Sequence, residues 1–265
     1  MNVLSLFDGM SCGQIALDQL GVPVKNYFAA EIDKYAIEIA RKNYPDMIHL
    51  GDVKNIKTSD THLMDEFDFG HKIDLLIGGS PCQGFSFGGK GLNFQDPRSR
   101  LFFEFDRLLK ALKPKYFLLE NVKMKKESEQ VITDYLGVEP IEINSRLVSA
   151  QNRKRLYWTN IPFDGVPEDK GIMLKDILEE ETAEFYRAGK YLQEKRRASD
   201  KNPDMLNPDY RSQANTIHDV ESKSGTVCAG THGYAIGYVP EPKGARIVNR
   251  RLDERGKRQD YNKDI

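Results

Sequence analysis

The chain has 265 residues, of which 39% are hydrophobic and 30% are charged, and its formal net charge is −1. This length is enough to bury a sizeable core, either in one large domain or in a main domain with a smaller one. The first apolar run, residues 3–7, is too short for a signal peptide or a membrane span, so neither export nor a membrane location is expected.

The chain begins with the pattern of a strand followed by a helix. Residues 2–7 (NVLSLF) form a short and nearly continuous apolar run, which is typical of a strand buried on both faces. Ser11 and Gln14 then have the spacing of a capping box, which predicts the start of a helix. Gly21 supplies a stop signal at the end of that helix.

A second strand, a second helix and two further strands follow. The run 27–32 (YFAAEI) predicts the second strand, and Asp33 is placed to cap a helix that continues until Pro45. The apolar runs 48–50 (IHL) and 73–77 (IDLLI) predict the third and fourth strands.

The next two elements complete the alternation. Residues 101–112 (LFFEFDRLLKAL) place their apolar side chains on one face of a helix, and residues 115–122 (KYFLLENV) predict the fifth strand. Alternating strands and helices predict an α/β fold with a doubly wound, mostly parallel sheet.

The predicted strands end in polar or glycine residues. Ligands of such sheets bind beyond the carboxyl ends of the strands, so these residues are candidates for a site. Ordinary turn chemistry explains glycine and aspartate there, but it does not explain a cysteine and carboxylates directly after apolar strands. In chain order the strands end in FDGMSCG (residues 7–13), Glu31, Gly51 with Asp52, Ser80 to Cys82, and Glu120 with Asn121.

The glycine loop FDGMSCG does not have a phosphate-binding pattern, because it lacks both the Walker spacing and the full G-x-G-x-x-G. Glu31 lies 23 residues after Asp8, close to the spacing at which an acid at the end of a second strand binds ribose hydroxyls. A ligand that has a ribose but no pyrophosphate fits this arrangement, and S-adenosylmethionine is such a ligand.

Cys82 lies in the stretch GGSPCQGFSFG at residues 78–88. A disulfide, a metal ligand, a packed thiol and a catalytic nucleophile are the possible roles. Three cysteines in a chain without an export signal indicate the reducing cytosol and argue against a structural disulfide, and Cys228 has no evident partner. The five histidines lack metal-ligand spacing, so no metal site is expected.

Positive charge gathers in the second half of the chain. Residues 187–265 contain 16 Lys and Arg against 11 Asp and Glu. Basic clusters lie at 123–126, 153–155, 195–197 and 255–258. Any one such cluster is most often a solvated face, but their concentration allows a polyanion to bind one side of the molecule.

Over residues 1–162 the chain resembles the cytosine-5 DNA methyltransferase family. The motifs FDGMSCG, EID, GDV, GGSPCQGFS, RLFFEF, ENV and QNRKRLYW occur in the family's order and with similar spacing. The resemblance is to bacterial and phage members, with similarity to the de novo class in SRLFFEFDRLL and in the FDG form of the loop. It implies a sheet of the S-adenosylmethionine-dependent methyltransferase type.

The resemblance implies catalytic roles for five residues. Cys82 would attack carbon 6 of cytosine, because a thiolate is nucleophilic near neutral pH and can later leave. Glu120 would hold the ring nitrogen and share a proton, and Asn121 would help to fix that loop. Arg153 and Arg155 would act on the side of the carbonyl oxygen and position Cys82.

The resemblance also implies S-adenosylmethionine as the methyl donor. Phe7 would stack on the adenine, Glu31 would bind the ribose hydroxyls, and Asp52 would accept a hydrogen bond from the adenine amino group. The implied cofactor-binding residues are Phe7, Asp8, Gly9, Met10, Cys12, Gly13, Glu31, Ile32, Asp52, Val53, Pro81 and Leu101.

Double-stranded DNA is the implied partner. The target base must leave the duplex before carbon 6 can be attacked. The glycine-rich stretch after Cys82 favours a lid that closes over the flipped base. Gln83, Ser86 and Arg98 are the implied DNA-binding residues.

The resemblance divides the chain into a catalytic and cofactor-binding domain at 1–162 and a target-recognition region at 163–265. The Gly-rich, β-like stretch at 223–239 suits a module that reads bases in the major groove. Members of the family end in a further segment that covers the cofactor, and no counterpart is found before Ile265. We therefore expect a truncated recognition region, completed by a C-terminal segment or by a second polypeptide.

The implied location is the cytoplasm of a bacterial or phage-infected cell, where restriction-modification is the expected context. Two alternatives remain. The first is a tRNA cytosine-5 methyltransferase, although the Cys-Phe-Thr signature of that branch is missing. The second is a non-catalytic DNA-binding module, which the intact set of catalytic residues argues against and the missing end favours.

Overall fold

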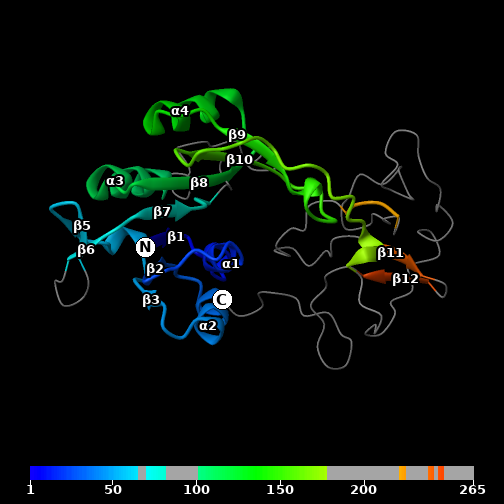
Figure 1. Cartoon of the computed structure of the whole chain (residues 1–265), viewed down its shortest axis with the longest axis horizontal. Helices are drawn as coiled ribbons and strands as arrows, with labels where there is room; N and C mark the ends of the chain where they lie inside the picture. The colour runs from blue at the N-terminus through cyan, green and yellow to red at the C-terminus, as the bar shows by residue number, and fades with distance from the viewer. Residues whose placement is uncertain (65–69, 82–100, 178–220, 225–237, 242–243, 248–265) are drawn as a thin grey trace, which may run out of the picture. The chain divides into compact units, whose positions relative to one another are not determined.

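The computed structural model describes residues 1–64, 70–81, 101–177, 221–224, 238–241 and 244–247 (Figure 1). The chain forms two compact units. The first consists of Met1–Ile143 with Lys154–Asp164, and the second of Asn144–Arg153 with Gly165–Ile265. The chain thus passes from the second unit to the first between Arg153 and Lys154, and Arg155 belongs to the first unit.

A seven-stranded sheet with the order β3-β2-β1-β7-β8-β10-β9 forms the framework (Figure 1). Strand β1 pairs in parallel with β2 and with β7, β2 pairs in parallel with β3, and β7 with β8. Strand β10 is antiparallel to β8. The strands are β1 (Asn2–Leu6), β2 (Asn26–Ala30), β3 (Ile48–His49), β7 (Leu75–Gly78), β8 (Tyr116–Val122), β9 (Ile141–Asn144) and β10 (Lys154–Thr159).

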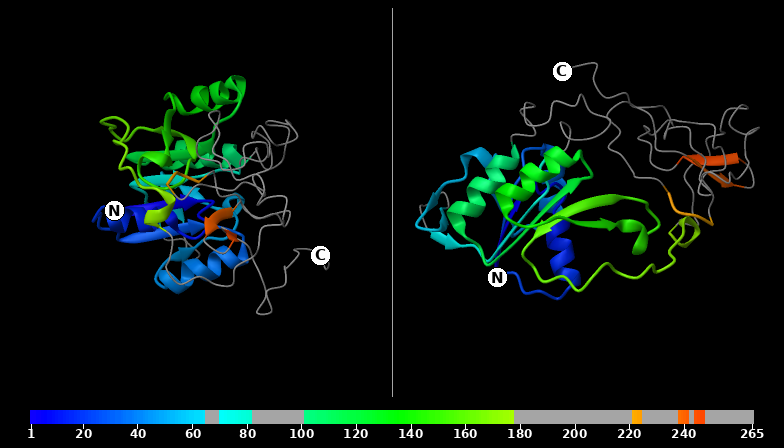
Figure 2. Two further views of the ribbon diagram at one scale, coloured as in Figure 1. Left: turned by 90° about the vertical axis from the view of Figure 1, so that its right-hand side faces the viewer. Right: turned by 90° about the horizontal axis from the view of Figure 1, so that it is seen from above.

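Helices cover both faces of this sheet. Side chains of α3 and α4 pack in one core cluster with β1, β7 and β8, whereas α1 and α2 pack in a second cluster on the other face. The right-hand view of Figure 2 shows α1 in dark blue and α3 in green on opposite sides of the strands. The helices are α1 (Cys12–Gln19), α2 (Lys34–Asn43), α3 (Phe102–Leu112) and α4 (Lys126–Leu136).

Short elements complete the described structure. Strands β4 (Thr58–Ser59), β5 (His62–Met64) and β6 (Gly70–Lys72) form an antiparallel sheet, and β11 (Tyr238–Glu241) pairs antiparallel with β12 (Gly244–Ile247). The 3-10 helices η1 (Val53–Asn55), η4 (Ser145–Leu147) and η5 (Leu174–Asp176) lie between longer elements.

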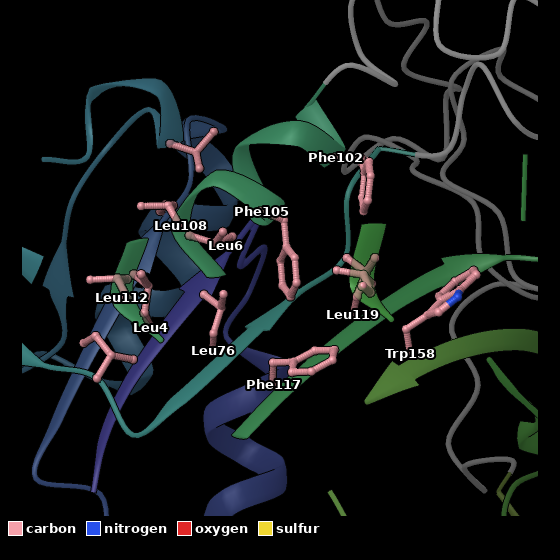
Figure 3. Close-up of a cluster of buried hydrophobic side chains, with 14 of the residues drawn as sticks. Leu4, Leu6, Leu76, Phe102, Phe105, Leu108, Leu112, Phe117, Leu119 and Trp158 are labelled. Carbon is pink, nitrogen blue, oxygen red and sulfur yellow. The ribbon is translucent and has the colours of Figure 1, made fainter. Parts of the chain in front are cut away.

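The larger core cluster is built where α3 crosses the sheet (Figure 3). Phe102, Phe105 and Leu108 of α3 have no exposed surface, and they pack with leucines of β1 and β7. Trp158 of β10 is equally buried, and its indole N–H donates to Thr133 Oγ1 of α4 at 3.0 Å. A buried indole retains a hydrogen bond in this way, so α4 is fixed in position against the sheet.

The main prediction of fold, an α/β protein with a mostly parallel sheet, is confirmed. Asp33 caps α2 as expected, because its carboxylate accepts from the amides of Tyr35 and Ala36. The capping box at Ser11 and Gln14 was wrong: Ser11 begins α1 in a left-handed conformation without a side-chain cap, and the Gln14 amide donates to Asp18 instead.

No helix in the described ranges is long and apolar enough to cross a membrane.

Candidate active site at the carboxyl ends of the strands

Strand β1 is the point at which the order of the sheet reverses, since β2 lies on one side of it and β7 on the other. In doubly wound sheets ligands bind beyond the carboxyl ends of the strands at such a point. The loop after β1 and residues 79–81 after β7 therefore meet at the expected place. Three further groups of side chains line this edge, from β2, β3 and β8.

The loop after β1 has an unusual backbone. Phe7 and Ser11 have positive φ angles of 58° and 65°, which non-glycine residues seldom adopt, and Gly9 has a φ of 61°. Hydrogen bonds hold this conformation: the amide of Asp8 donates to the carbonyl of Ala30, and the amide of Gly9 donates to Glu31 Oε2 at 2.8 Å. The loop is thereby tied to the end of β2.

The Asp8 side chain points into the protein. Its two carboxylate oxygens accept from Ser11 Oγ at 2.6 Å and from the Tyr27 hydroxyl at 2.8 Å, and all three side chains are buried. Burial, and then the charge of Asp8, raise the pKa of Tyr27, so the hydroxyl remains a proton donor at neutral pH. The Asp8 carboxylate thus holds the loop through its hydrogen bonds with the buried Ser11 and Tyr27 side chains.

Glu31 fixes the start of the second helix and the glycine loop together. Besides Gly9, the amides of Ile32 and Asp33 donate to its Oε1 at 2.7 and 2.9 Å. A carboxylate has about four lone-pair positions, and three amides already donate to this one, so a single position on Oε2 remains for a ligand hydroxyl. Next to it Ile32 is 73% exposed, and Met10 on the glycine loop is 49% exposed. This edge combines a hydrogen-bonding carboxylate with uncovered apolar side chains.

Gly13 lies where α1 approaches the sheet most closely. A Cβ atom at this position would come within 2.3 Å of Ile77 Cδ1 and 2.7 Å of the Tyr27 hydroxyl. The glycine is therefore required by helix packing, which brings the start of α1 and the exposed Cys12 to the strand ends.

Asp52 and Val53 follow β3. The Asp52 carboxylate accepts from the Lys54 amide at 3.0 Å and begins η1, after Gly51 with a φ of 72°. The Val53 side chain is buried in the larger core cluster, so only its backbone can face a ligand. Leu101, at the start of α3, is partly buried against the same cluster.

Glu120 on β8 and Arg155 on β10 form an ion pair. Arg155 Nε lies 2.8 Å from Glu120 Oε1, without the alignment of a hydrogen bond to any described residue. The two side chains are 13% and 30% exposed, so the pair is only partly screened by water. A Cβ atom on Gly79 would lie 3.2 Å from Glu120 Oε2, which shows how closely the carboxylate approaches residues 79–81.

Asn121 holds the same segment from the buried side of the sheet. Its amide nitrogen lies 3.1 Å from Ser80 Oγ and 3.3 Å from the Ser80 carbonyl oxygen, and both residues are buried. Glu120 and Asn121 therefore contact neighbouring residues of one short segment from opposite faces of β8. Pro81 ends that segment, is partly buried, and is followed in the sequence by Cys82.

Arg153 belongs to the second unit. Its backbone amide donates to Asn144 Oδ1 at 3.0 Å, and its carbonyl accepts from the Ser145 amide at 3.1 Å. Cys82, Gln83, Ser86 and Arg98, predicted for the nucleophile and for DNA contacts, lie outside the described residues.

Two contributors to this edge were missed by the sequence analysis. Tyr27 was treated only as a strand residue, although a hydroxyl in an otherwise apolar strand signals a buried hydrogen bond. Ser80 was read as part of a motif, without the role of receiving Asn121. Among the described residues no group of three or more His, Cys, Asp or Glu side chains could hold a metal ion.

The fold is shared with a crystal structure of the S. pombe Dnmt2 methyltransferase. The TM-score is 0.58 at 18% sequence identity, and the match covers 90% of this chain and 75% of that chain. The two chains thus share the α/β fold with a mostly parallel sheet.

Residues 1–262 match the C-5 cytosine-specific DNA methylase family, and the chain belongs to this family. It is 38% identical over 205 residues to the type II methyltransferase M.NlaIV of Neisseria lactamica, covering 66% of this chain and 46% of that relative. It is 34% identical over 195 residues to the orphan methyltransferase M.SPRI of Bacillus phage SPR, covering 68% and 42%. The chain spans about half the length of the curated relatives it matches.

Proposed function

We propose that this chain carries the catalytic machinery of a DNA (cytosine-5-)-methyltransferase, which transfers a methyl group to carbon 5 of a flipped cytosine through a covalent Cys82 adduct. The observation that carries the proposal is the Glu120–Arg155 pair, which lies against Gly79 at the carboxyl ends of the strands. Family membership and relatives named type II methyltransferases support it.

The nucleophile is Cys82, which follows directly on Pro81. Carbon 5 of cytosine is a poor nucleophile until a thiolate adds to carbon 6 and moves an electron pair onto carbon 5. Loss of the carbon-5 proton after methyl transfer then expels the thiolate and restores the aromatic ring. Asn121 and Ser80 support this step by fixing the backbone that leads to Cys82.

Glu120 acts at the ring nitrogen beside the amino group. When the thiolate adds, negative charge develops on the ring, and a shared proton from Glu120 limits it. The ion pair with Arg155 holds the carboxyl group in position for this contact. Arg153 and Arg155 offer guanidinium groups to the carbonyl oxygen of the base, where fixed donors stabilise developing charge.

The strand ends of β1, β2 and β3 fit S-adenosylmethionine. The one remaining acceptor position of Glu31 suits a ribose hydroxyl, and exposed Ile32 and Met10 suit the apolar faces of the ligand. Asp52 offers a carboxylate for the adenine amino group. When bound, S-adenosylmethionine supplies an electrophilic methyl group that the activated carbon 5 accepts. The further residues proposed for this site are Phe7, Asp8, Gly9, Cys12, Gly13, Val53, Pro81 and Leu101.

Duplex DNA is the proposed substrate, and the base is flipped out at a cost of a few kcal/mol. We assign Gln83, Ser86 and Arg98 to DNA contacts and residues 163–265 to target recognition. The pairing of β11 with β12 is compatible with a small β module. The activity is placed in the cytoplasm of a bacterial or phage-infected cell, in a restriction-modification setting.

A C-terminal segment or a second polypeptide is proposed to complete the cofactor site. This proposal is supported by the extent of the match with a relative, because the match covers 46% of the length of the Neisseria lactamica methyltransferase. Apolar contact contributes roughly 25 cal/mol per Å² to binding, so an uncovered ligand binds weakly. Calorimetry with S-adenosylmethionine tests this: weak binding by the 265-residue chain supports the proposal, and low-micromolar binding with full turnover contradicts it.

The proposed function is tested by tritium transfer from labelled S-adenosylmethionine to duplex DNA and to tRNA. Label in DNA cytosine supports the proposal, and label in tRNA alone assigns the chain to the tRNA alternative. No label in either, with retained DNA binding, favours the non-catalytic module.

A further inference from the structure

The second unit contains a buried lysine that the proposed chemistry does not use. Lys223 is 3% exposed, and its ammonium group donates to the carbonyl oxygen of Arg146 and to Asp169 Oδ1, the latter at 2.9 Å. Burial of an ammonium group is costly unless it is paired and hydrogen-bonded. The lysine therefore acts as a fixed link between two segments that are distant from it in the sequence.

Backbone hydrogen bonds join the same segments. We call Asn144–Arg153 the arginine loop and residues 221–224 the lysine segment. The Ser224 amide donates to the Ala150 carbonyl, and the Asn152 amide donates to the Ser224 carbonyl, both at 2.8 Å. Gln151 and Ser224 form an isolated parallel bridge. The lysine segment thus runs alongside the end of the arginine loop.

The lysine segment also holds residues 169–176. The Leu174 amide donates to the Ser222 carbonyl at 2.9 Å, and the Lys170 amide donates to the Leu147 carbonyl of the arginine loop at 2.8 Å. The hydrogen bond from Lys223 lowers the pKa of Asp169, so that this carboxylate stays ionised at neutral pH. The arginine loop, residues 169–176 and the lysine segment are consequently held together by hydrogen bonds at and around Lys223.

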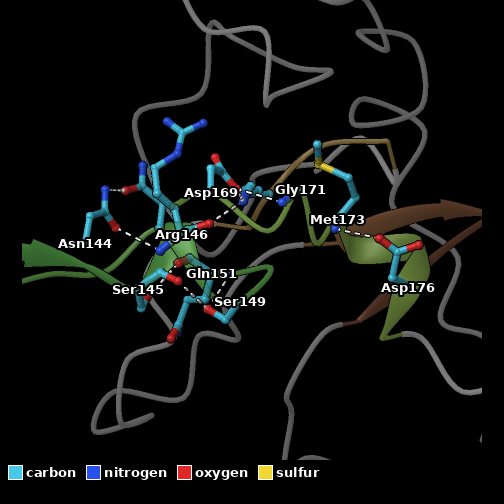
Figure 4. A network of polar contacts seen from close by, with 11 residues as sticks. Asn144, Ser145, Arg146, Ser149, Gln151, Asp169, Gly171, Met173 and Asp176 are labelled. Atoms are coloured by element: carbon cyan, nitrogen blue, oxygen red, sulfur yellow. Dashed lines mark hydrogen bonds and ion pairs between the residues drawn. The ribbon is translucent and has the colours of Figure 1, made fainter. Parts of the chain in front are cut away.

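Hydrogen bonds within the arginine loop connect Arg146, which binds Lys223, to Arg153. Asn144 Oδ1 accepts from the Arg146 amide at 3.2 Å (Figure 4), and it also accepts from the Arg153 amide at 3.0 Å. The Ser145 hydroxyl donates to the Gln151 carbonyl at 2.7 Å. The Arg146 carbonyl that binds Lys223 is therefore connected through Asn144 to the backbone of Arg153, within one unit.

We infer that Lys223 is a positioning residue for Arg153, acting through Arg146 and the arginine loop. The inference rests on the proposed function, because Arg153 acts there on the base carbonyl. It makes methyl transfer depend on a segment that lies within the region assigned to target recognition. The lysine itself touches neither base nor methyl donor in this scheme.

Lys223→Met tests the link, because it keeps an unbranched side chain of similar length and removes the ammonium group. We expect the rate constant for methyl transfer to fall about tenfold or more, with the KM for S-adenosylmethionine unchanged. The amides of Asn152, Leu174 and Ser224 should exchange hydrogen faster, whereas those of β1 and β7 should not. Lys223→Arg keeps the charge and should recover most of the rate.

Lys175→Met is the matched control. Lys175 forms an ion pair with Glu221, which also joins residues 169–176 to the lysine segment, but the lysine is 49% exposed. Exposed ion pairs contribute little, so we expect this variant to keep its rate within about twofold.

The inference is overturned if Lys223→Met exchanges its loop amides at the wild-type rate, whether or not the chain methylates DNA. It is also overturned if the rate falls equally in Lys223→Met and Lys223→Arg, or if exchange accelerates in β1 and β7 as well. Failure of the proposed function looks different: the wild-type chain then lacks methyl transfer, while the exchange comparison still tests the link.

Discussion

Nε of Arg155 lies 2.8 Å from Oε1 of Glu120, across the neighbouring strands β10 and β8. Arg155 is directly opposite Val122 in the antiparallel register, so Glu120 is its diagonal neighbour on the same face of the sheet. The other face of β8 carries Asn121, which contacts Ser80. The end of β8 thus presents the Glu120 carboxylate on one face, and on the other face it supports the segment before Cys82 through Asn121.

Replacing Glu120 with Gln keeps the shape of the side chain and weakens proton sharing. We expect the methylation rate to fall about 100-fold or more, because general acid–base contributions have this size. DNA affinity, measured by a filter or anisotropy assay, should barely change.

Glu142→Gln is the control for this variant, since Glu142 pairs with Lys123 at 2.7 Å on a more exposed part of the same sheet. We expect it to methylate at the wild-type rate. A Glu120→Gln enzyme as fast as this control would show that Glu120 is only a structural strand end.

Tyr27→Phe removes the hydroxyl that donates to the buried Asp8 carboxylate. The loss of one such hydrogen bond costs about 1–3 kcal/mol of unfolding free energy, because a buried acceptor loses its partner. The glycine loop above it should loosen, and the Kd for S-adenosylmethionine should rise severalfold in calorimetry. Tyr135→Phe removes a hydroxyl from a 45% exposed side chain and should change neither quantity. Equal effects of the two substitutions would contradict the supporting role of Tyr27.

His49 predicts a dependence of stability on pH. Neither of its ring nitrogens is exposed, and neither forms a hydrogen bond within the described part of the chain. Burial lowers the pKa of His49, the positive charge of Arg41 lowers it further, and Asp8 opposes this in part. The unfolded chain therefore binds the proton more readily than the folded chain.

The stabilising effect of neutral His49 is complete above its ordinary pKa of about 6.5 and is lost as the pH falls below that value. His49→Phe should therefore reduce the difference in unfolding free energy between pH 7.5 and pH 5.5. Urea titrations at the two pH values measure it. His62→Phe is the control, and an unchanged difference in the His49 variant would contradict the assignment.

Features set by neighbouring residues could be predicted from the sequence. The cap at Asp33 needs only the next few amides, and the positive φ of Gly21 follows from its place at a helix end. The short strands β4, β5 and β6 were missed, because two or three residues give no readable period. Helix α4 was missed as well, since residues 123–126, which lead into it, were interpreted only as a basic cluster.

The sequence predicted which strand ends contribute to the candidate site. It could not predict the contacts between their side chains. The sequence placed Glu120 and Arg155 in two motifs, but their contact depends on β10 pairing antiparallel beside β8. The Ser11 signal was misread for a similar reason. Its hydroxyl donates to Asp8 instead of accepting from a helix amide, a choice set by the buried Tyr27 and Asp8 and not by local spacing.

Covalent trapping tests the central claim most directly. The chain is incubated with saturating S-adenosylmethionine and a duplex in which 5-fluorocytosine replaces cytosine, because fluorine at carbon 5 prevents the final loss of a proton. Long incubation is sufficient, since a single turnover leaves an adduct that survives a denaturing gel. We expect an adduct with the wild-type chain and none with Cys82→Ser, while both chains bind the methyl donor alike. An adduct that persists in Cys82→Ser, or its absence from the wild-type chain, would contradict the account.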